Sequence, residues 1–223
     1  MPGLQTTFQS LRPGAPTLEA ALYLPDGDGP FPGAVVCHPH PSGGGSMHVF
    51  LVVSIAKELA KSGIAAILFN FCGVGESGGA FTDGKSEPED VLGALEFLSS
   101  REDIDASRLG LTGWSFGAWM ALAALAEGAP VRSVVSVAAP VGMYDSNAIV
   151  DGIRASSARR HYVLGERDQF CSVDDLEQFA ESISPTEAGS IHILRKADHF
   201  LFTREAEVAT LVTQLLSKDL LKI

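Results

Sequence analysis

The sequence has few cysteines and few basic residues, and each shortage excludes a class of protein. Its three cysteines, Cys37, Cys72 and Cys171, are too sparse for a disulfide framework. They include no Cys-x-x-Cys pair of the kind that binds structural zinc. We therefore expect a reducing, cytoplasmic setting. The 16 Lys and Arg residues against 27 Asp and Glu leave a net charge of −11, which argues against a nucleic-acid partner.

Long apolar runs are also missing. No stretch of about 18 uninterrupted apolar residues occurs, so we expect no membrane span and no membrane partner. Residues 1–5 lack the basic start and apolar run of a secretory signal. The chain does have a hydrophobic share of 46% against a charged share of 19% over 223 residues, which is typical of a sizeable buried core. Without repeats or long linkers, residues 1–223 are expected to form one domain.

Short apolar runs alternate along the chain with segments of helical length. Such runs indicate strands buried on both faces, and their alternation with helices predicts an α/β fold. We expect a doubly wound, mostly parallel sheet of about 7–8 strands with helices on both faces. Strands are expected at 18–25, 33–41, 64–71, 108–114, 131–140, 160–165 and 190–195, with an outer partner at 6–10. Helices are expected at 47–62, 87–100, from 115, near 173–183 and near 203–221.

Two segments contain Gly-x-Ser-x-Gly, the pattern of a serine nucleophile on a sharp turn from a strand into a helix. Around Ser115 ("GWSFG") a strand precedes the serine and an Ala-rich helix follows directly. Ser77 ("GVGESGG") is followed by a polar loop instead, and no helix starts there. The Gly-x-Gly-x-x-Gly spacing of residues 73–78 fails as a dinucleotide site for the same reason, because the pyrophosphate needs a helix start. Ser115 is the expected nucleophile; a tight turn without catalysis and a nucleotide-binding loop are the alternatives.

A serine nucleophile needs a histidine to take its proton and a carboxylate to orient that histidine. In a doubly wound hydrolase these follow the serine in the order acid, then histidine. His199 lies in the loop after the last expected strand, whereas His161 and His192 lie inside strands, so His199 is the expected base. Asp168, just past the end of a strand, is the expected acid, and Asp145, one strand earlier, is the second choice.

The oxyanion of the intermediate needs two backbone N–H donors. Phe116, directly after the serine, supplies the first, and the loop after strand 33–38 should supply the second. In that loop Pro39 and Pro41 have no N–H, so His40 is the first candidate, through its backbone. His38, His40 and His48 could suggest a metal, but His38 and His40 flank a rigid proline and no carboxylate lies nearby in the sequence to complete a tetrahedral set, and we expect neither metal nor cofactor.

These motifs together resemble the α/β-hydrolase superfamily over essentially the full length of the chain. Within it, the chain is similar to the small bacterial, dienelactone-hydrolase-like branch of serine hydrolases. The resemblance is carried by "HPHP" at 38–41, "NFCGVGESGG" at 70–79, the elbow "GWSFG", and the loops "GERDQF" and "ADHFL". It implies the fold and the Ser115, Asp168 and His199 triad.

Two departures from that branch bear on substrate. Cys72 stands where the branch usually has arginine, which removes a charge beside the site and disfavours anionic substrates. Dienelactone hydrolases proper use a cysteine nucleophile, whereas this elbow carries Ser115. We therefore expect a serine carboxylesterase acting on small-molecule esters. A small peptidase or amidase with the same triad, and a non-catalytic binding protein on this scaffold, are the alternatives. The sequence leaves the oligomeric state open, a homodimer included.

The expected site has no lid. About 20 residues separate Pro140 from Arg160, where hydrolases of this fold often carry a cap, and a connection of that length holds only one helix. No cap domain fits. The expected walls of the substrate pocket are bulky and favour short acyl chains: Trp114, Phe116, Trp119, Phe170 and Phe200.

Overall fold

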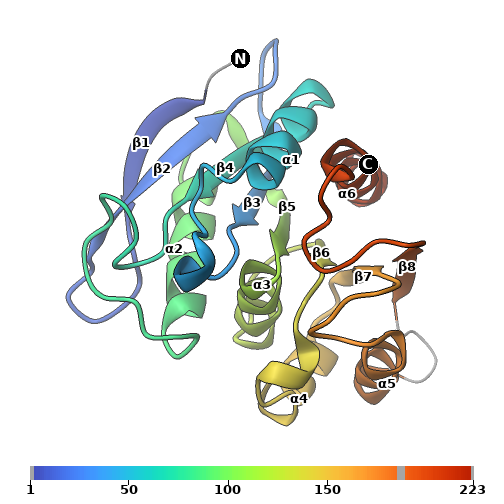
Figure 1. Ribbon diagram of the computed structural model, residues 1–223. Helices are drawn as coiled ribbons and strands as arrows, with labels where there is room; N and C mark the ends of the chain where they lie inside the picture. Colours follow the sequence, from blue (N-terminus) through green and yellow to red (C-terminus); the bar gives the residue numbers. More distant parts are fainter. Residues whose placement is uncertain (1–2, 185–188, 222–223) are drawn as a thin grey trace.

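The computed structural model describes residues 3–184 and 189–221, and its centre is an eight-stranded sheet (Figure 1). The strand order is β1-β2-β4-β3-β5-β6-β7-β8. β1 and β2 are antiparallel at one edge, and β4 begins the parallel part. The strands are β1 Leu4–Gln9, β2 Thr17–Tyr23, β3 Phe31–Cys37, β4 Ala65–Phe69, β5 Ile104–Trp114, β6 Ser133–Val137, β7 Arg159–Gly165 and β8 Ser190–Leu194.

Helices cover both faces of the sheet, because the parallel strands need crossover connections. α1 and α6 pack on one face, and α2, α3, α4 and α5 pack on the other (Figure 1). The helices are α1 Phe50–Lys61, α2 Glu87–Ser99, α3 Phe116–Ala126, α4 Asn147–Ala155, α5 Val173–Ile183 and α6 Glu205–Leu220, with short 3-10 turns η1 Pro41–Gly43 and η2 Val141–Met143. The predicted α/β-hydrolase fold is therefore confirmed.

β4 shows why the strands read as continuous apolar runs. All five of its residues are buried. Ile67 and Phe69 point into the core under α2 and α3, while Ala66 and Leu68 point into the core under α1 and α6. Successive side chains of a strand alternate between faces, so both faces must be apolar when both are covered.

Several boundaries differ from the sequence prediction by a few residues, and two of them have a clear cause. α1 begins at Phe50 rather than at 47, because residues 46–49 form a turn, closed by the N–H of Val49 and the carbonyl of Ser46 (3.1 Å), and Val49 has an extended ψ of 133°. β5 begins four residues before the predicted 108. The polar residues Asp105 and Ser107 interrupt the apolar pattern, so the sequence did not indicate this start. Ile104 pairs with Phe31, and the register shifts between Phe31 and Gly33.

The connection from β6 to β7 contains only η2 and α4. No cap is inserted between residues 138 and 158, all of which are described, so the lidless prediction is confirmed. Among the described helices, none combines the length and the hydrophobicity that crossing a membrane requires.

Candidate active site

Ser115 occupies the turn between the end of β5 and the start of α3. Its backbone has φ +55° and ψ −120°, which a residue with a side chain rarely adopts and which costs about 1–3 kcal/mol. The flanking glycines allow this turn. A Cβ on Gly113 would lie 2.4 Å from the carbonyl carbon of Gly117, and one on Gly117 would lie 2.4 Å from the oxygen of Cys37. The two glycines therefore allow the tight turn that holds the hydroxyl of Ser115 above the sheet.

The structure brings Ser115 and His199 together with Asp168. Oγ of Ser115 lies 2.8 Å from Nε2 of His199, and Nδ1 of the same ring lies 2.8 Å from Oδ2 of Asp168. The side chain of His199 is 6% exposed and that of Asp168 is fully buried. An ionised carboxylate only accepts hydrogen bonds, so it places the ring proton on Nδ1 and leaves Nε2 free to accept from the serine.

Asp168 lies in the tight turn that follows β7. Its Oδ1 accepts hydrogen bonds from the backbone N–H groups of Phe170 (2.8 Å) and Cys171 (3.2 Å). These bonds fix the carboxylate in the orientation in which it meets His199. Asp145, the second-choice acid, lies in the turn before α4, where it accepts from the N–H of Asn147 (3.1 Å). No hydrogen bond in the described part of the chain links Asp145 to His199.

The loop that carries His199 packs closely on the end of β7. A Cβ on Gly165 would lie 2.6 Å from the carbonyl oxygen of Ala197, so only glycine allows this approach. The backbone of His199 is held from both sides: its N–H donates to Gln169 (3.1 Å), and its carbonyl accepts from the indole of Trp114 (3.2 Å). The imidazole is thus positioned by neighbours from β5 and from the acid loop.

The side chains of Phe116 and His40, the two expected oxyanion donors, are in contact. Phe116 is the first residue of α3, where a helix leaves its N–H groups without intrahelical acceptors. The ring of His40 packs edge-on against that of Phe116 at 5.1 Å. Its Nδ1 accepts from the N–H of Ser42 (3.2 Å), so Nε2 carries the proton and donates to Asp83 (2.8 Å). The ring is therefore engaged structurally, which leaves the backbone as the part of His40 available to a substrate.

His38, by contrast, is a fully buried residue that joins two strand ends. Its Nδ1 donates to the carbonyl of Pro39 (2.7 Å), and its Nε2 accepts from the N–H of Phe71 (3.2 Å). Burial lowers the pKa of His38 to about 4. Both ring nitrogens are used, and no group of three His, Cys, Asp or Glu residues in the described ranges is arranged to hold a metal.

Ser77 has a structural role. It is buried, its Oγ donates to the carbonyl of Asn70 (2.7 Å), and the same oxygen accepts from the N–H of Glu19 (3.0 Å). The next helix begins only at Glu87. Residues 73–79 therefore form a loop without a helix start, as predicted, and lack the anion site that a dinucleotide would need.

The predicted pocket aromatics divide into two groups. Trp114, Phe170 and Phe200 surround His199, with ring centroids 6.5, 4.5 and 5.7 Å from the imidazole. Phe116 and Trp119 instead lie on α3, where both are buried and contact the ring of Tyr144, with centroids 6.3 and 5.5 Å away. Sequence reasoning missed Tyr144, which lies in a connection without a motif. Burial, with Asp83 and Glu87 nearby, raises the pKa of Tyr144 to about 12.

A buried arginine was also missed. Arg12, from the turn between β1 and β2, is 7% exposed and pairs with Asp90 (2.5 Å) and Glu87 (2.9 Å) of α2. The thiol of Cys72 donates to the same Asp90 (3.2 Å). A guanidinium from the first hairpin therefore contacts the same carboxylate as Cys72, although position 72 itself carries no positive charge. Sequence separation hid this contact, since the partners lie 75 and 78 residues apart.

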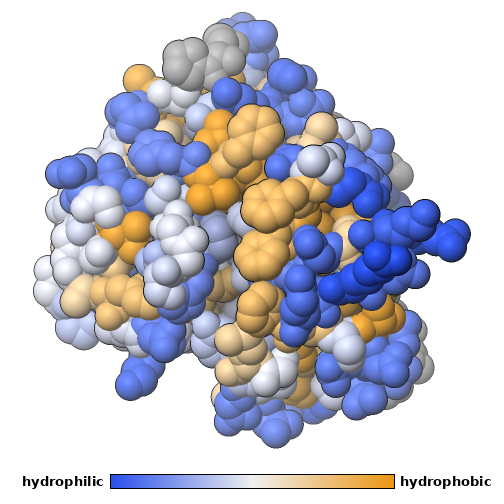
Figure 2. All heavy atoms as spheres, viewed as in Figure 1, coloured by the Kyte–Doolittle hydropathy of each residue, from blue (hydrophilic) through white to orange (hydrophobic). Residues whose placement is uncertain are grey.

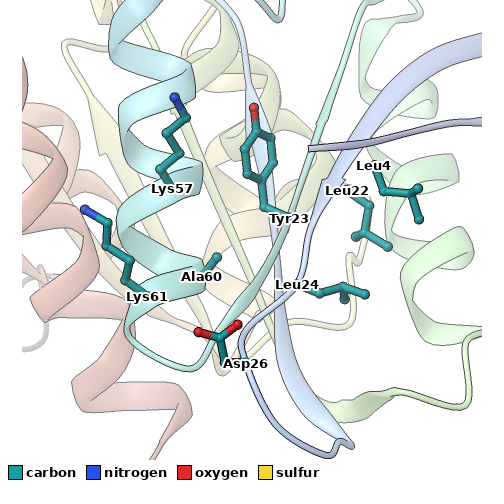
Figure 3. A pocket seen from close by; sticks show the side chains of 8 residues that line it. All are labelled: Leu4, Leu22, Tyr23, Leu24, Asp26, Lys57, Ala60 and Lys61. Atoms are coloured by element: carbon teal, nitrogen blue, oxygen red, sulfur yellow. The ribbon is translucent and has the colours of Figure 1, made fainter. Parts of the chain in front are cut away.

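A separate recess of about 230 Å³ lies between β2 and α1. Figure 3 shows Lys57 and Lys61 projecting from α1 on one side of Tyr23, with the leucine side chains on the other. None of its lining residues belongs to the Ser115 site, so it plays no part in the arrangement above.

The fold and the relay of Ser115, His199 and Asp168 define an α/β-hydrolase of the serine hydrolase class. Residues 15–180 match the X-Pro dipeptidyl-peptidase family, S15. That match spans well over half of the chain, and the chain belongs to this family.

Two similar solved structures are α/β serine hydrolases, and the chain also has an uncharacterized relative. An α/β serine hydrolase homologue from Coxiella burnetii is 28% identical, with a TM-score of 0.80 over 96% of this chain and 97% of that chain. A lidless α/β serine hydrolase from Xanthomonas campestris is 25% identical, with a TM-score of 0.81 over 100% of this chain and 98% of that chain. An uncharacterized protein of Rickettsia prowazekii is 29% identical over 192 residues, 83% of this chain and 78% of the relative.

Proposed function

We propose that this serine hydrolase is a carboxylesterase that cleaves esters of short carboxylic acids through an acyl-enzyme intermediate. The observation that carries the proposal is the hydrogen-bonded relay from Ser115 through His199 to buried Asp168, in a fold without a cap. A complete relay also argues against a non-catalytic binding protein on this scaffold, because nothing in mere binding requires the strained Ser115 backbone.

In the proposed reaction, Oγ of Ser115 attacks the ester carbonyl while Nε2 of His199 takes its proton. The N–H groups of Phe116 and His40 donate to the oxyanion. His199 then passes the proton to the leaving alcohol oxygen, and Asp168 stabilises the imidazolium throughout. Water, activated by the same histidine, attacks the acyl-enzyme and releases the acid.

A peptidase with the same triad is the second candidate, and membership of the X-Pro dipeptidyl-peptidase family favours it. An exopeptidase of this kind needs free carboxylates to bind the substrate's terminal amine. Of the carboxylates near the oxyanion loop, Glu87 and Asp90 are buried and paired with Arg12, while Asp83 is exposed and accepts from His40. The pairing of the two buried carboxylates supports the ester over the peptide as substrate.

The test is a panel of p-nitrophenyl esters beside p-nitroanilides of X-Pro dipeptides, with fluorophosphonate labelling of the active serine. We expect ester turnover and labelling, both lost in Ser115→Ala, and little anilide turnover. Anilide hydrolysis at a higher kcat/KM than ester hydrolysis would establish the peptidase instead.

We also propose a cytoplasmic setting. All three cysteines are unpaired and buried, which is the expected state of thiols in a reducing compartment.

A further inference from the structure

A group of exposed aromatic side chains lies beside His199 and has no part in the relay. Phe170, Phe200 and Phe202 are 41%, 42% and 68% exposed. We call these three residues the aromatic rim. Figure 2 shows hydrophobic side chains gathered in a band down the middle of this face, across the loop before α6. Exposed aromatic surface of this kind, next to a site, indicates a binding surface.

The loop before α6 has a strained backbone, and this backbone exposes the side chains of the aromatic rim. Leu201 and Thr203 have φ of +55° and +65°, although neither is glycine. The side chain of Leu201 is buried in the core under α1 and α6, and Oδ1 of Asp198 accepts from the N–H groups of Phe200 and Leu201. This anchoring leaves Phe200 and Phe202 stacked, with ring centroids 5.7 Å apart and planes 11° apart. Strain held in place beside a site is a sign of function.

The rim is continuous with the catalytic base. The rings of Phe170 and Phe200 both meet the imidazole of His199 edge-to-face, with centroids 4.5 and 5.7 Å away. His199 is the group that must hand a proton to the departing oxygen, so the alcohol part of an ester has to lie against this ring. The acyl part points away from it. The aromatic rim therefore borders the alcohol side of the site.

From this placement we infer that the aromatic rim binds the alcohol part of the substrate, and that the preferred substrates are esters of apolar, ring-containing alcohols. This inference rests on the proposed esterase function. A ring in the alcohol covers the exposed faces of Phe200 and Phe202 and removes apolar surface from water, whereas a methyl group reaches neither.

The test uses acetates of methyl, benzyl and 2-naphthylmethyl alcohol, so that the acyl group stays constant. Methyl and benzyl alcohols have similar acidity, which matches the chemistry of their departure. We expect kcat/KM to rise about tenfold from the methyl to the benzyl ester, since ring burial removes tens of Å² of apolar surface from water. Phe202→Ala should lower the benzyl-to-methyl ratio about fivefold, as one stacking partner is lost.

Leu11→Ala is the matched control, since Leu11 is 49% exposed but lies in the turn between β1 and β2. It should leave the ratio unchanged. A ratio near one in the wild type, or an equal ratio in Phe202→Ala, would overturn the inference while ester turnover preserved the proposed function. No turnover of any ester would overturn the function itself. Sedimentation with phosphatidylcholine vesicles that depended on Phe202 would assign the rim to a lipid surface instead.

Discussion

The carboxylate of Asp168 lies 2.8 Å from Nδ1 of His199, and the hydroxyl of Ser115 lies 2.8 Å from Nε2 of the same ring. The acid and the nucleophile thus meet opposite nitrogens of one imidazole. Because the carboxylate can only accept a hydrogen bond, it decides which nitrogen carries the proton. The chemistry of Ser115 therefore depends on a side chain that does not contact it.

Asp168→Asn is expected to lower kcat by about four orders of magnitude, because the amide can donate to Nδ1 and so stabilises the wrong tautomer of His199. Steady-state kinetics on p-nitrophenyl acetate measure the loss. Asp145→Asn is the matched control and should be nearly silent, since Asp145 bonds only within its own turn. If the two variants exchanged their behaviour, the acid would lie after the earlier strand.

Ser115→Ala should abolish fluorophosphonate labelling and remove most ester turnover, because no other group can form the acyl-enzyme. Ser77→Ala should keep both. It should instead lower the free energy of unfolding by about 1 kcal/mol or more, since it leaves the buried carbonyl of Asn70 and the partly buried N–H of Glu19 without their partner. Labelling that survived the first change and vanished with the second would reverse the assignment.

Acyl-chain length should show a narrow optimum. The fold has no cap, and Phe116 beside the proposed oxyanion site is enclosed by the rings of His40, Phe81 and Tyr144. A shallow pocket gains about 0.8 kcal/mol per buried methylene only until its depth is used, so kcat/KM on p-nitrophenyl esters should peak at about two to six carbons. Activity should also not jump when substrate forms droplets. A preference for acyl chains beyond about ten carbons would indicate a deep channel instead.

Acid should destabilise the protein through His38. Its pKa is about 4 when folded, below the ordinary 6.5, because the buried ring is cut off from water. The unfolded chain therefore takes up this proton first, and the free energy of unfolding falls as pH drops from about 6.5 towards 4. His38→Gln should shrink the fall between pH 7 and 4.5 by about 2 kcal/mol, measured by urea denaturation.

The control for that experiment is His48→Gln, because His48 is an exposed histidine in the same segment of the chain. It should leave the pH dependence unchanged. An equal fall in stability for the wild type and His38→Gln would place the acid sensitivity elsewhere.

Much of this molecule could be predicted from local pattern. Buried strands read as apolar runs because both faces of the sheet are covered, and glycines at 113 and 117 mark the elbow because no Cβ fits there. The positions of Asp168 and His199 followed from chain order and from the loops at strand ends. The structure places His199 against Ser115, and Asp168 against His199. Their catalytic roles stay a prediction.

Other features could not be predicted because they depend on contacts between distant parts of the chain. Arg12 meets its carboxylates only after the first hairpin folds against α2. Tyr144 stacks on Trp119 from a connection that carries no motif. Phe202 lies between Leu201 and Thr203, which both have a left-handed backbone conformation that the sequence "HFLFTR" does not indicate.

The pairing of Arg12 with Asp90 has a consequence for the history of the family. Asp90 accepts both from the guanidinium of Arg12 and from the thiol of Cys72, so positions 12 and 72 serve one buried carboxylate. A chain with arginine at position 72 has no need of a second cation at position 12, and two cations there would repel. In an alignment of relatives we therefore expect these two positions to co-vary: the cation should stand at position 12 or at position 72, and position 90 should remain acidic.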